Sequence, residues 1–200
     1  MRKVLVAALT ASLILSVPAV SANEASAVNP RTIEASGTFT FTTSAGILPT
    51  WTSAGIALVG ISPGSVITTS ASLNARITLP VVAKTRTANA TAGGFRFLNS
   101  ETGQSVRCQV PTIDTRARLV GCVLADGTSS NLFVITEIAD RFKVRDDGNI
   151  TTYFRGIDLS FVDSATAARM NTELGTNVFS ASVTVARGAL EVSRELSTSP

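Results

Sequence analysis

The side chains that most often carry out catalysis or bind metals are scarce in this sequence. Its 200 residues include two Cys and no His. Without His, the chain cannot form a Ser-His-Asp triad, a Cys-His dyad, a paired-His zinc site or a His-ligated haem. A phosphate-binding loop and a dinucleotide-binding fingerprint are also missing from the sequence. We therefore expect no catalytic residue, no metal site and no cofactor.

Carboxylates are the remaining groups that could act as general acid and base. The candidate pairs are Asp146 with Asp147 and Asp158 with Asp163. Adjacent Asp residues in a strand point to opposite faces of a sheet, and in a turn they are usually solvated. The dipeptide of Asp147 and Gly148 is typical of a tight hairpin turn, and a calcium site is the competing interpretation of these acids. These acids leave a hydrolase that works without His as an alternative function, although neither pair has a spacing that is typical of an active site.

Cys108 and Cys122 are expected to form a disulfide. Both lie in segments with strand character, and residues 111–116 connect the two segments. If the hairpin folds near Thr115, the two Cys lie directly opposite each other, at a separation that a disulfide can span. Neither Cys-x-x-Cys spacing nor a third metal ligand accompanies them, which argues against a redox or metal site.

The first 22 residues have the pattern of a secretory signal peptide. Arg2 and Lys3 precede an apolar run over residues 4–17, and small residues lead to a cleavage site after Ala22. The apolar run is too short for a spanning helix. We therefore expect a secreted or extracytoplasmic protein, with no transmembrane anchor in its mature form, in a compartment where disulfides persist.

The charge of the chain argues against nucleic acid as a partner. The sequence has 17 Lys and Arg against 14 Asp and Glu, and residues 1–22 contain two of the basic residues and none of the acidic ones. Cleavage therefore leaves a net charge of about +1. A nearly balanced chain lacks the basic stripe that binds nucleic acid or anionic lipid. The expected partner is an unknown protein, a cell-envelope component or a second copy of the chain.

Alternation of apolar and polar residues dominates the chain after the signal peptide. Residues 38–42 read Thr-Phe-Thr-Phe-Thr, which places Phe on one face and Thr on the other. Similar patterns predict strands at residues 56–59, 65–69, 73–82, 94–98, 105–110, 117–124, 131–138, 142–145, 150–161 and 181–192. The expected fold is all-β, an antiparallel β-sandwich that is immunoglobulin-like or barrel-like. It comprises an N-terminal extension (23–35), a single β-sandwich domain (36–192) and a flexible tail (193–200).

One short helix is expected near the C-terminus, over residues 163–174. Asp163 or Ser164 can cap its N-terminus, and Gly175 lies where a left-handed C-terminal cap belongs. The apolar residues of the segment fall on one helical face. We expect this helix to pack on the sheet.

The order of these elements resembles that of secreted actinobacterial β-domains that are distantly similar to the HtaA-type domains of surface haem-uptake proteins. The resemblance covers nearly all of residues 36–192 and includes the helix and Phe179. It is also carried by Leu79-Pro80-Val81, Gly93-Gly94-Phe95-Arg96-Phe97, Val110-Pro111-Thr112-Ile113-Asp114, Ile135–Ile138 and Ile157-Asp158-Leu159. It implies a β-rich extracytoplasmic binding module. In the haem-uptake members it implies a pocket with Tyr as axial ligand and a nearby His.

Two aromatic residues are candidate ligand contacts. Tyr153, the only Tyr, could ligate iron as a phenolate or serve as an ordinary strand aromatic. Trp51, the only Trp, lies in a weaker helical pattern over residues 48–54 and could stack on a ligand or fill the core. The expected function is a secreted or cell-envelope-associated, non-enzymatic domain that binds a protein partner or self-associates. The alternatives are a carrier of haem or another apolar small ligand, and the His-free hydrolase.

Overall fold

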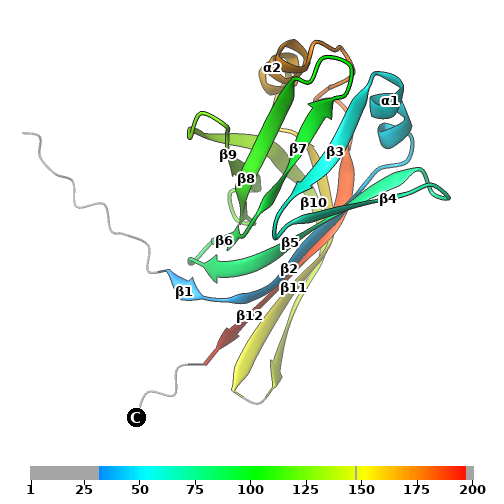
Figure 1. The fold of residues 1–200 in the computed structure, drawn as a ribbon. Coiled ribbons are helices and arrows are strands. Elements are labelled where there is room, and N and C mark those ends of the chain that lie inside the picture. Colours follow the sequence, from blue (N-terminus) through cyan, green and yellow to red (C-terminus); the bar gives the residue numbers. More distant parts are fainter. Residues whose placement is uncertain (1–31, 147, 197–200) are drawn as a thin grey trace, which may run out of the picture.

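The computed structural model describes residues 32–146 and 148–196. In these residues the chain forms twelve strands and two helices (Figure 1). The helices are α1 (Ile47–Ser53) and α2 (Ser164–Leu174). The strands are β1 (Ile33–Glu34), β2 (Ser36–Thr43), β3 (Ile56–Ile61), β4 (Ser65–Thr69), β5 (Asn74–Lys84), β6 (Ala88–Thr91), β7 (Gly94–Asn99), β8 (Ser105–Asp114), β9 (Leu119–Val123), β10 (Ser129–Asp146), β11 (Asn149–Phe161) and β12 (Ala186–Glu195).

Eight of the described strands close into a ring. β5, β2, β12, β11, β10, β9 and β8 pair side by side in that order, and the short strand β6 pairs with both β8 and β5. All of these pairings are antiparallel. The all-β class holds, but the expected β-sandwich is wrong, because one sheet closes on itself as a barrel.

The closure depends on features that an alternation pattern does not reveal. β6 has four residues and was not among the expected strands, yet it joins the two ends of the ring. β10 is continuous over 18 residues, whereas the sequence pattern predicts two separate strands there. Register shifts between Ile135 and Glu137, and between Arg155 and Ile157, mark bulges in the long strands. Bulges bend strands and increase their twist, which allows a single sheet to curve into a barrel.

Four further strands extend the sheet beyond the ring. β1 and β4 pair with β5, and β7 and β3 follow β8. β1 falls within residues 23–35, and β12 continues to Glu195. The predicted signal peptide, residues 1–22, lies outside the described residues, as do residues 197–200 of the predicted tail.

Phenylalanines and branched aliphatic residues fill the interior. Phe39 and Phe41 of β2 are buried, and the neighbouring residues Thr38, Thr40 and Thr42 are more exposed, as the alternation predicts. Phe95 and Phe97 on β7 are 1% exposed and contact each other edge to face. An eight-stranded barrel is narrow enough for its own side chains to fill. The interior is therefore a packed core along most of its length.

α2 confirms the helix expected from sequence. Its bounds are Ser164–Leu174, and the Asp163 carboxylate accepts a hydrogen bond from the Thr166 N–H at 2.7 Å. Gly175 ends the helix in the left-handed conformation, with φ of 63°. However, α2 is not the only helix and does not end the chain, because β12 follows it. The expectation of a single helix near the C-terminus is therefore wrong.

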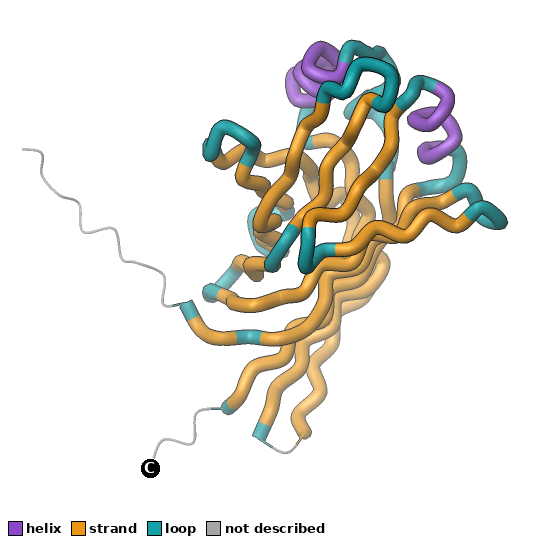
Figure 2. Tube along the Cα trace, in the orientation of Figure 1, coloured by secondary structure: helices purple, strands orange, loops and turns teal. Residues whose placement is uncertain are grey.

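Both helices lie at one end of the molecule (Figure 2), and the longest strand pair, β10 with β11, extends to the other end (Figure 1). α1 follows β2 and carries the buried residues Leu48 and Trp51. Neither helix in the described part of the chain has the length and apolar character of a membrane crossing.

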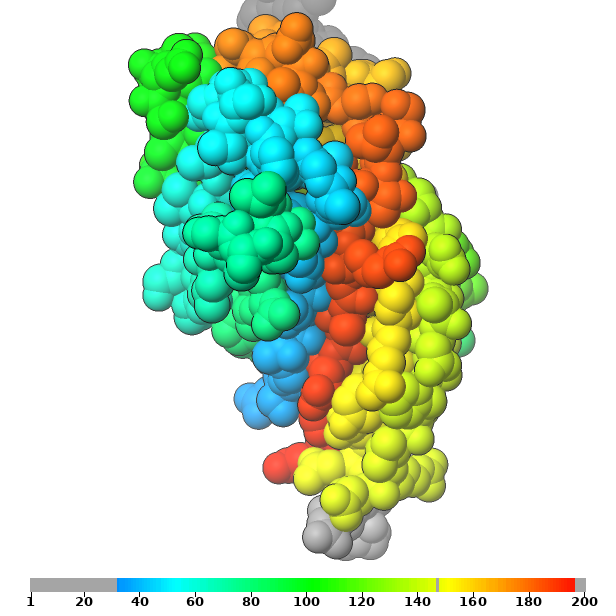
Figure 3. Space-filling model, turned by 90° about the vertical axis from the view of Figure 1, so that its right-hand side faces the viewer, coloured from blue at the N-terminus to red at the C-terminus, as the bar shows by residue number. Residues whose placement is uncertain are grey.

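β12 runs between β2 and β11 and forms the long side of the molecule (Figure 3). Its pairing with β2 ends at Ser193 opposite Ser36, while its pairing with β11 continues to Glu195 opposite Asn149. On the N-terminal side of Ser36, the chain no longer pairs with β12. There β1 pairs with β5, with Ile33 opposite Lys84. The sheet therefore splits at this end, where β1 and β12 diverge (Figure 1).

Candidate functional site

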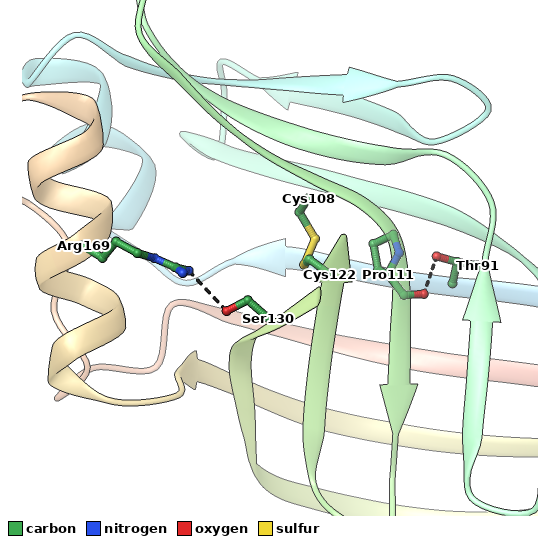
Figure 4. The surroundings of a disulfide bond; sticks show 6 residues. All are labelled: Thr91, Cys108, Pro111, Cys122, Ser130 and Arg169. Carbon is green, nitrogen blue, oxygen red and sulfur yellow. Dashed lines mark hydrogen bonds between the residues drawn. A yellow bond between two sulfur atoms is a disulfide. The ribbon is translucent and has the colours of Figure 1, made fainter. Parts of the chain in front are cut away.

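The structure joins Cys108 and Cys122 in a disulfide, which confirms the predicted pairing (Figure 4). Their Cα atoms are 4.9 Å apart, and both side chains are buried. The two Cys are not directly opposite in the β8–β9 register, because Asp114 pairs with Leu119 and the hairpin therefore turns later than Thr115. The pairing also shifts between Gln109 and Thr112. A bulge at this point, with Val110 at φ of 43°, displaces one strand relative to the other. A disulfide is typical of proteins outside the cytoplasm.

The two aromatic candidates are far apart in the fold. Trp51 is 4% exposed and packs on Phe97 and Phe179, with ring centroids 5.3 and 5.5 Å away. Tyr153 lies on β11, where its ring stacks on Phe142 of β10 at 4.8 Å between centroids. α1 lies at one end of the molecule, and the first residues of β11 lie at the other (Figure 1). Trp51 is thus part of the packed core, and the structure does not bring these two residues into one site.

The candidate carboxylates have structural contacts. Asp158 is 7% exposed and accepts hydrogen bonds from Arg187 Nε and Nη2 at 2.6 and 2.8 Å. These hydrogen bonds lower the pKa of Asp158, burial opposes the shift, and the charge of Arg187 adds to it. Asp163 caps α2, and its pKa is lowered first by its hydrogen bond to the Thr166 N–H. Both acids therefore stabilise the fold in their ionised forms.

The turn between β3 and β4 contains a sequence that resembles a serine-hydrolase motif. Residues 60–64 read Gly-Ile-Ser-Pro-Gly, which matches Gly-x-Ser-x-Gly. In hydrolases this motif forms a sharp turn between a strand and a helix, with a His nearby. Here the segment joins β3 to β4, two strands, and the chain has no His. The match therefore describes a turn between strands and supports no nucleophile.

Five basic side chains line one cavity at the end of the barrel away from the helices. They come from β5, β10, β12 and the loop between β5 and β6, and they are Lys84, Arg86, Arg141, Lys143 and Arg194. The cavity has a volume of about 150 Å³. Its other lining residues are Thr85, Thr87, Asn89, Thr115, Ile150, Thr152, Phe154 and Val192. We call these five residues the basic cluster. No carboxylate lines the cavity in the part of the chain that the structure describes.

A bulge turns Lys84 toward the cavity. The β5–β6 register pairs Val81 with Thr91, then shifts, and then pairs Lys84 with Asn89. Val81, Asn89 and Thr91 are all buried. In an uninterrupted strand, Lys84 would lie on the face opposite to Val81, since neighbouring side chains alternate. The extra residue reverses this relation and places the Lys84 side chain beside Asn89 inside the barrel.

Strand alternation places the remaining strand-borne cations on the same inner face. Arg141 lies opposite Phe154 and Lys143 lies opposite Thr152, and both of these partners are buried. The Arg141 guanidinium lies over the Phe154 ring, 5.1 Å from its centroid. Arg194 of β12 lies opposite Ile150 of β11, which is also buried. The long strands thus carry cations at the point where the apolar core ends.

The cations of the cluster repel one another. Burial lowers the pKa of Lys84, and the charges of Arg194, Lys143 and Arg141 lower it further. In the described residues, the ion pairs are those of Arg169 with Glu173 and of Arg187 with Asp158, so none compensates the basic cluster. Uncompensated positive charge in a recess favours the binding of an anion.

Sequence reasoning missed the basic cluster. The nearly balanced net charge led to the expectation of no basic stripe for nucleic acid or anionic lipid, but net charge says nothing about where charges gather. One local signal was present, because Arg141, Lys143 and Arg145 alternate and therefore share a strand face. The contribution of Lys84 and Arg194 could not be foreseen, since it depends on the bulge in β5 and on the pairing of β12 with β11.

Comparisons with known proteins give one distant match. No family model matches the chain, and no curated protein matches its sequence. Among solved structures, the haem-binding protein HtaB from Corynebacterium glutamicum matches with 11% sequence identity and a TM-score of 0.45. The match covers 81% of this chain and 96% of that protein. The two proteins are only distantly similar in backbone fold. At this sequence identity, the ligand of that protein cannot be assigned to this chain.

Proposed function

We propose that this chain is a non-enzymatic binding protein that holds a small anionic group at the mouth of its barrel. The observation that carries the proposal is the basic cluster, in which five cationic side chains line one cavity without a carboxylate among the described residues. Grouping like charges costs free energy, which an anion bound between them would recover. Charge-assisted hydrogen bonds from Arg and Lys are the usual means of holding phosphate and carboxylate groups.

The dimensions of the cavity support a small group over a protein partner. Its volume of about 150 Å³ is below the roughly 300–1,000 Å³ of sites for drug-sized ligands. It suits a single phosphate, sulfate or carboxylate, either free or at the end of a larger molecule. Lys84 is half-buried and Asn89 is buried, so a flat protein surface would contact the rim and leave these residues unused. A ligand carrier is therefore the better supported of the two binding functions.

We also propose that the protein works outside the cytoplasm, after cleavage following Ala22. The pattern of residues 1–22 supports export, and the disulfide supports an oxidising compartment. Phosphate-, sulfate- and carboxylate-bearing molecules would then reach the barrel mouth from the cell envelope or the surrounding medium.

Calorimetric titration with inorganic phosphate, sulfate and acetate tests the proposal. The test variant is the double substitution Lys84→Met and Lys143→Met, which removes two charges from the cavity. The matched control is Arg96→Gln with Arg107→Gln, since these residues lie opposite each other on β7 and β8, away from the cavity. We expect saturable binding that weakens with added NaCl. The cavity variant should lose at least about tenfold in affinity, and the control should lose less than twofold.

Two results would overturn the proposal. One is the absence of saturable binding for all three anions at low ionic strength. The other is an equal loss of affinity in the cavity variant and the control, because binding would then follow net charge and not the basic cluster.

A further inference from the structure

A larger groove adjoins the basic cluster. It has a volume of about 620 Å³ and lies where the strands β1 and β12 diverge. Its lining residues are Ile33, Glu34, Ala35, Ser36, Val81, Val82, Asn149, Ser193, Arg194 and Glu195. This volume falls in the range of roughly 300–1,000 Å³ that is typical of small-molecule sites.

One side of the groove is apolar and open to solvent. Ile33 is 40% exposed and Val82 is 48% exposed, although both are large apolar residues. Ala35 and Val81 continue this apolar lining toward the core. Covering such side chains with another apolar group removes their surface from water and stabilises the complex.

The apolar lining and the basic cluster are neighbours in the fold. Ile33 of β1 lies directly opposite Lys84 of β5 in the register, and Arg194 lines both the groove and the cavity. A ligand that binds both spaces therefore needs no gap between its charged part and its apolar part. Glu34 and Glu195 also line the groove, and their carboxylates would repel an anionic group placed there. This repulsion favours one orientation, with the anion in the cavity and the apolar part in the groove.

We propose that the ligand is a single-chain anionic amphiphile, in which one phosphate or carboxylate head group carries an alkyl chain. The head group binds between Lys84, Lys143 and Arg194, and the first part of the chain lies against Ile33 and Val82. This inference rests on the proposed function, since it names the kind of molecule whose anionic group the basic cluster holds. The evidence for it is the position of an uncompensated cationic cavity beside an exposed apolar groove.

A probe series with one head group and increasing chain length tests the inference. Methyl, octyl and dodecyl phosphate are titrated below their micelle-forming concentrations. In the unmodified protein, affinity should rise with chain length, by at least about 100-fold from methyl to dodecyl phosphate, because each buried methylene adds to binding. Val82→Asn and Ile33→Asn should reduce this gain by at least about tenfold and leave the affinity for methyl phosphate unchanged. Ile67→Asn is the matched control, because Ile67 is 61% exposed on β4 and does not line the groove.

The outcomes separate the two proposals. If methyl phosphate binds and a longer chain gives no gain, the amphiphile inference is overturned and the anion-binding function stands. If the gain persists in the Val82 and Ile33 variants, the chain does not lie in this groove and the inference is again overturned. If none of the three probes binds, the proposed function itself fails.

Discussion

Burial and the positive charge of Arg194 together lower the pKa of Lys84, although the two residues come from strands far apart in the sequence. An unfolded chain would bind a proton to this Lys more readily than the folded barrel does. Between the lowered pKa and the ordinary value of 10.5, the unfolded state holds more protons, so the free energy of unfolding rises as pH rises through that window.

Replacement of Lys84 should reveal this repulsion. We expect Lys84→Met to raise the melting temperature of the ligand-free protein by about 1–3 °C at pH 7. The variant should also lack the alkaline rise in stability and gain less stability from added phosphate than the unmodified protein does. Differential scanning calorimetry between pH 7 and 10.5 measures each effect. Arg107→Met, at an exposed position on β8, is the control and should change the melting temperature by less than about 1 °C. A lower melting temperature for Lys84→Met would show that repulsion between Lys84 and the other cations does not destabilise the folded protein.

Tyr153 and the basic cluster lie on different faces of β11. Thr152 and Phe154 line the cavity, and Tyr153 between them points away, against Phe142. One haem molecule therefore cannot place its iron on Tyr153 and its carboxylates in the cluster. We expect Tyr153→Phe to leave any haem-induced change in the Soret band unaltered, and Lys84→Met with Lys143→Met to reduce it. Loss of the Soret change in Tyr153→Phe alone would assign haem to the outer face and contradict this expectation.

The disulfide should contribute strongly to stability. Replacing both Cys108 and Cys122 by Ala is expected to lower the free energy of unfolding by about 3 kcal/mol, because the cross-link restricts the unfolded chain. Urea denaturation followed by circular dichroism measures the loss, and the β-type spectrum of the folded state should persist. The unmodified protein, once reduced, is the control and should unfold at nearly the same urea concentration as the double variant. Equal stability of the oxidised protein and the variant would show that the disulfide does not stabilise the fold.

The contact between Asp158 and Arg187 should make the fold sensitive to acid. The pKa of Asp158 is below its ordinary value of 3.8, so its stabilising effect is present above pH 3.8 and is lost as pH falls through the lowered value. Asp158→Asn should lower stability at pH 7 and flatten the pH dependence below pH 4, as urea denaturation at several pH values would show. Glu173→Gln, which breaks an exposed pair with Arg169 on α2, should change little. An unchanged acid dependence in Asp158→Asn would contradict the assignment.

Gly175 should be difficult to replace by a branched residue. Its φ of 63° is left-handed, and a Cβ there would lie 3.2 Å from Gln104 Oε1. We expect Gly175→Val to lower the free energy of unfolding by about 1–2 kcal/mol. Gly175→Asn should cost less, because Asn tolerates this conformation. Similar stabilities for the two variants in thermal denaturation would mean that the backbone at this position relaxes.

Local features of the fold could be predicted from the sequence, and closure could not. The alternation around Phe39 and the capping of α2 by Asp163 and Gly175 depend on neighbouring residues, and both were predicted correctly. The pairing of Cys108 with Cys122 was also predicted, but its register was not, because the hairpin turns later than Thr115 and because the bulge at Val110 depends on contacts between strands.

The candidate site was less predictable than the fold for the same reason. Arg141 and Lys143 share a face by simple alternation, whereas Lys84 reaches that face only through a shift in the β5–β6 register. Arg194 reaches it because β12 pairs with β11, a contact that no local pattern encodes. A site assembled from distant strands requires the whole topology to be known.

The short strand β6 makes the closure of the barrel its weakest junction between strands. Three register pairs join it to β5 and three join it to β8. The Asn89 amide donates to the Ile113 carbonyl at 3.3 Å, and the Thr91 hydroxyl donates to the Pro111 carbonyl at 2.8 Å, so side chains reinforce a seam with few backbone contacts. Separation along this seam would break fewer contacts than separation of the longer pairs, and local opening follows the weakest contacts. Because Asn89 also borders the basic cavity, local opening of β6 would disturb one wall of the cavity while the longer strand pairs stay intact.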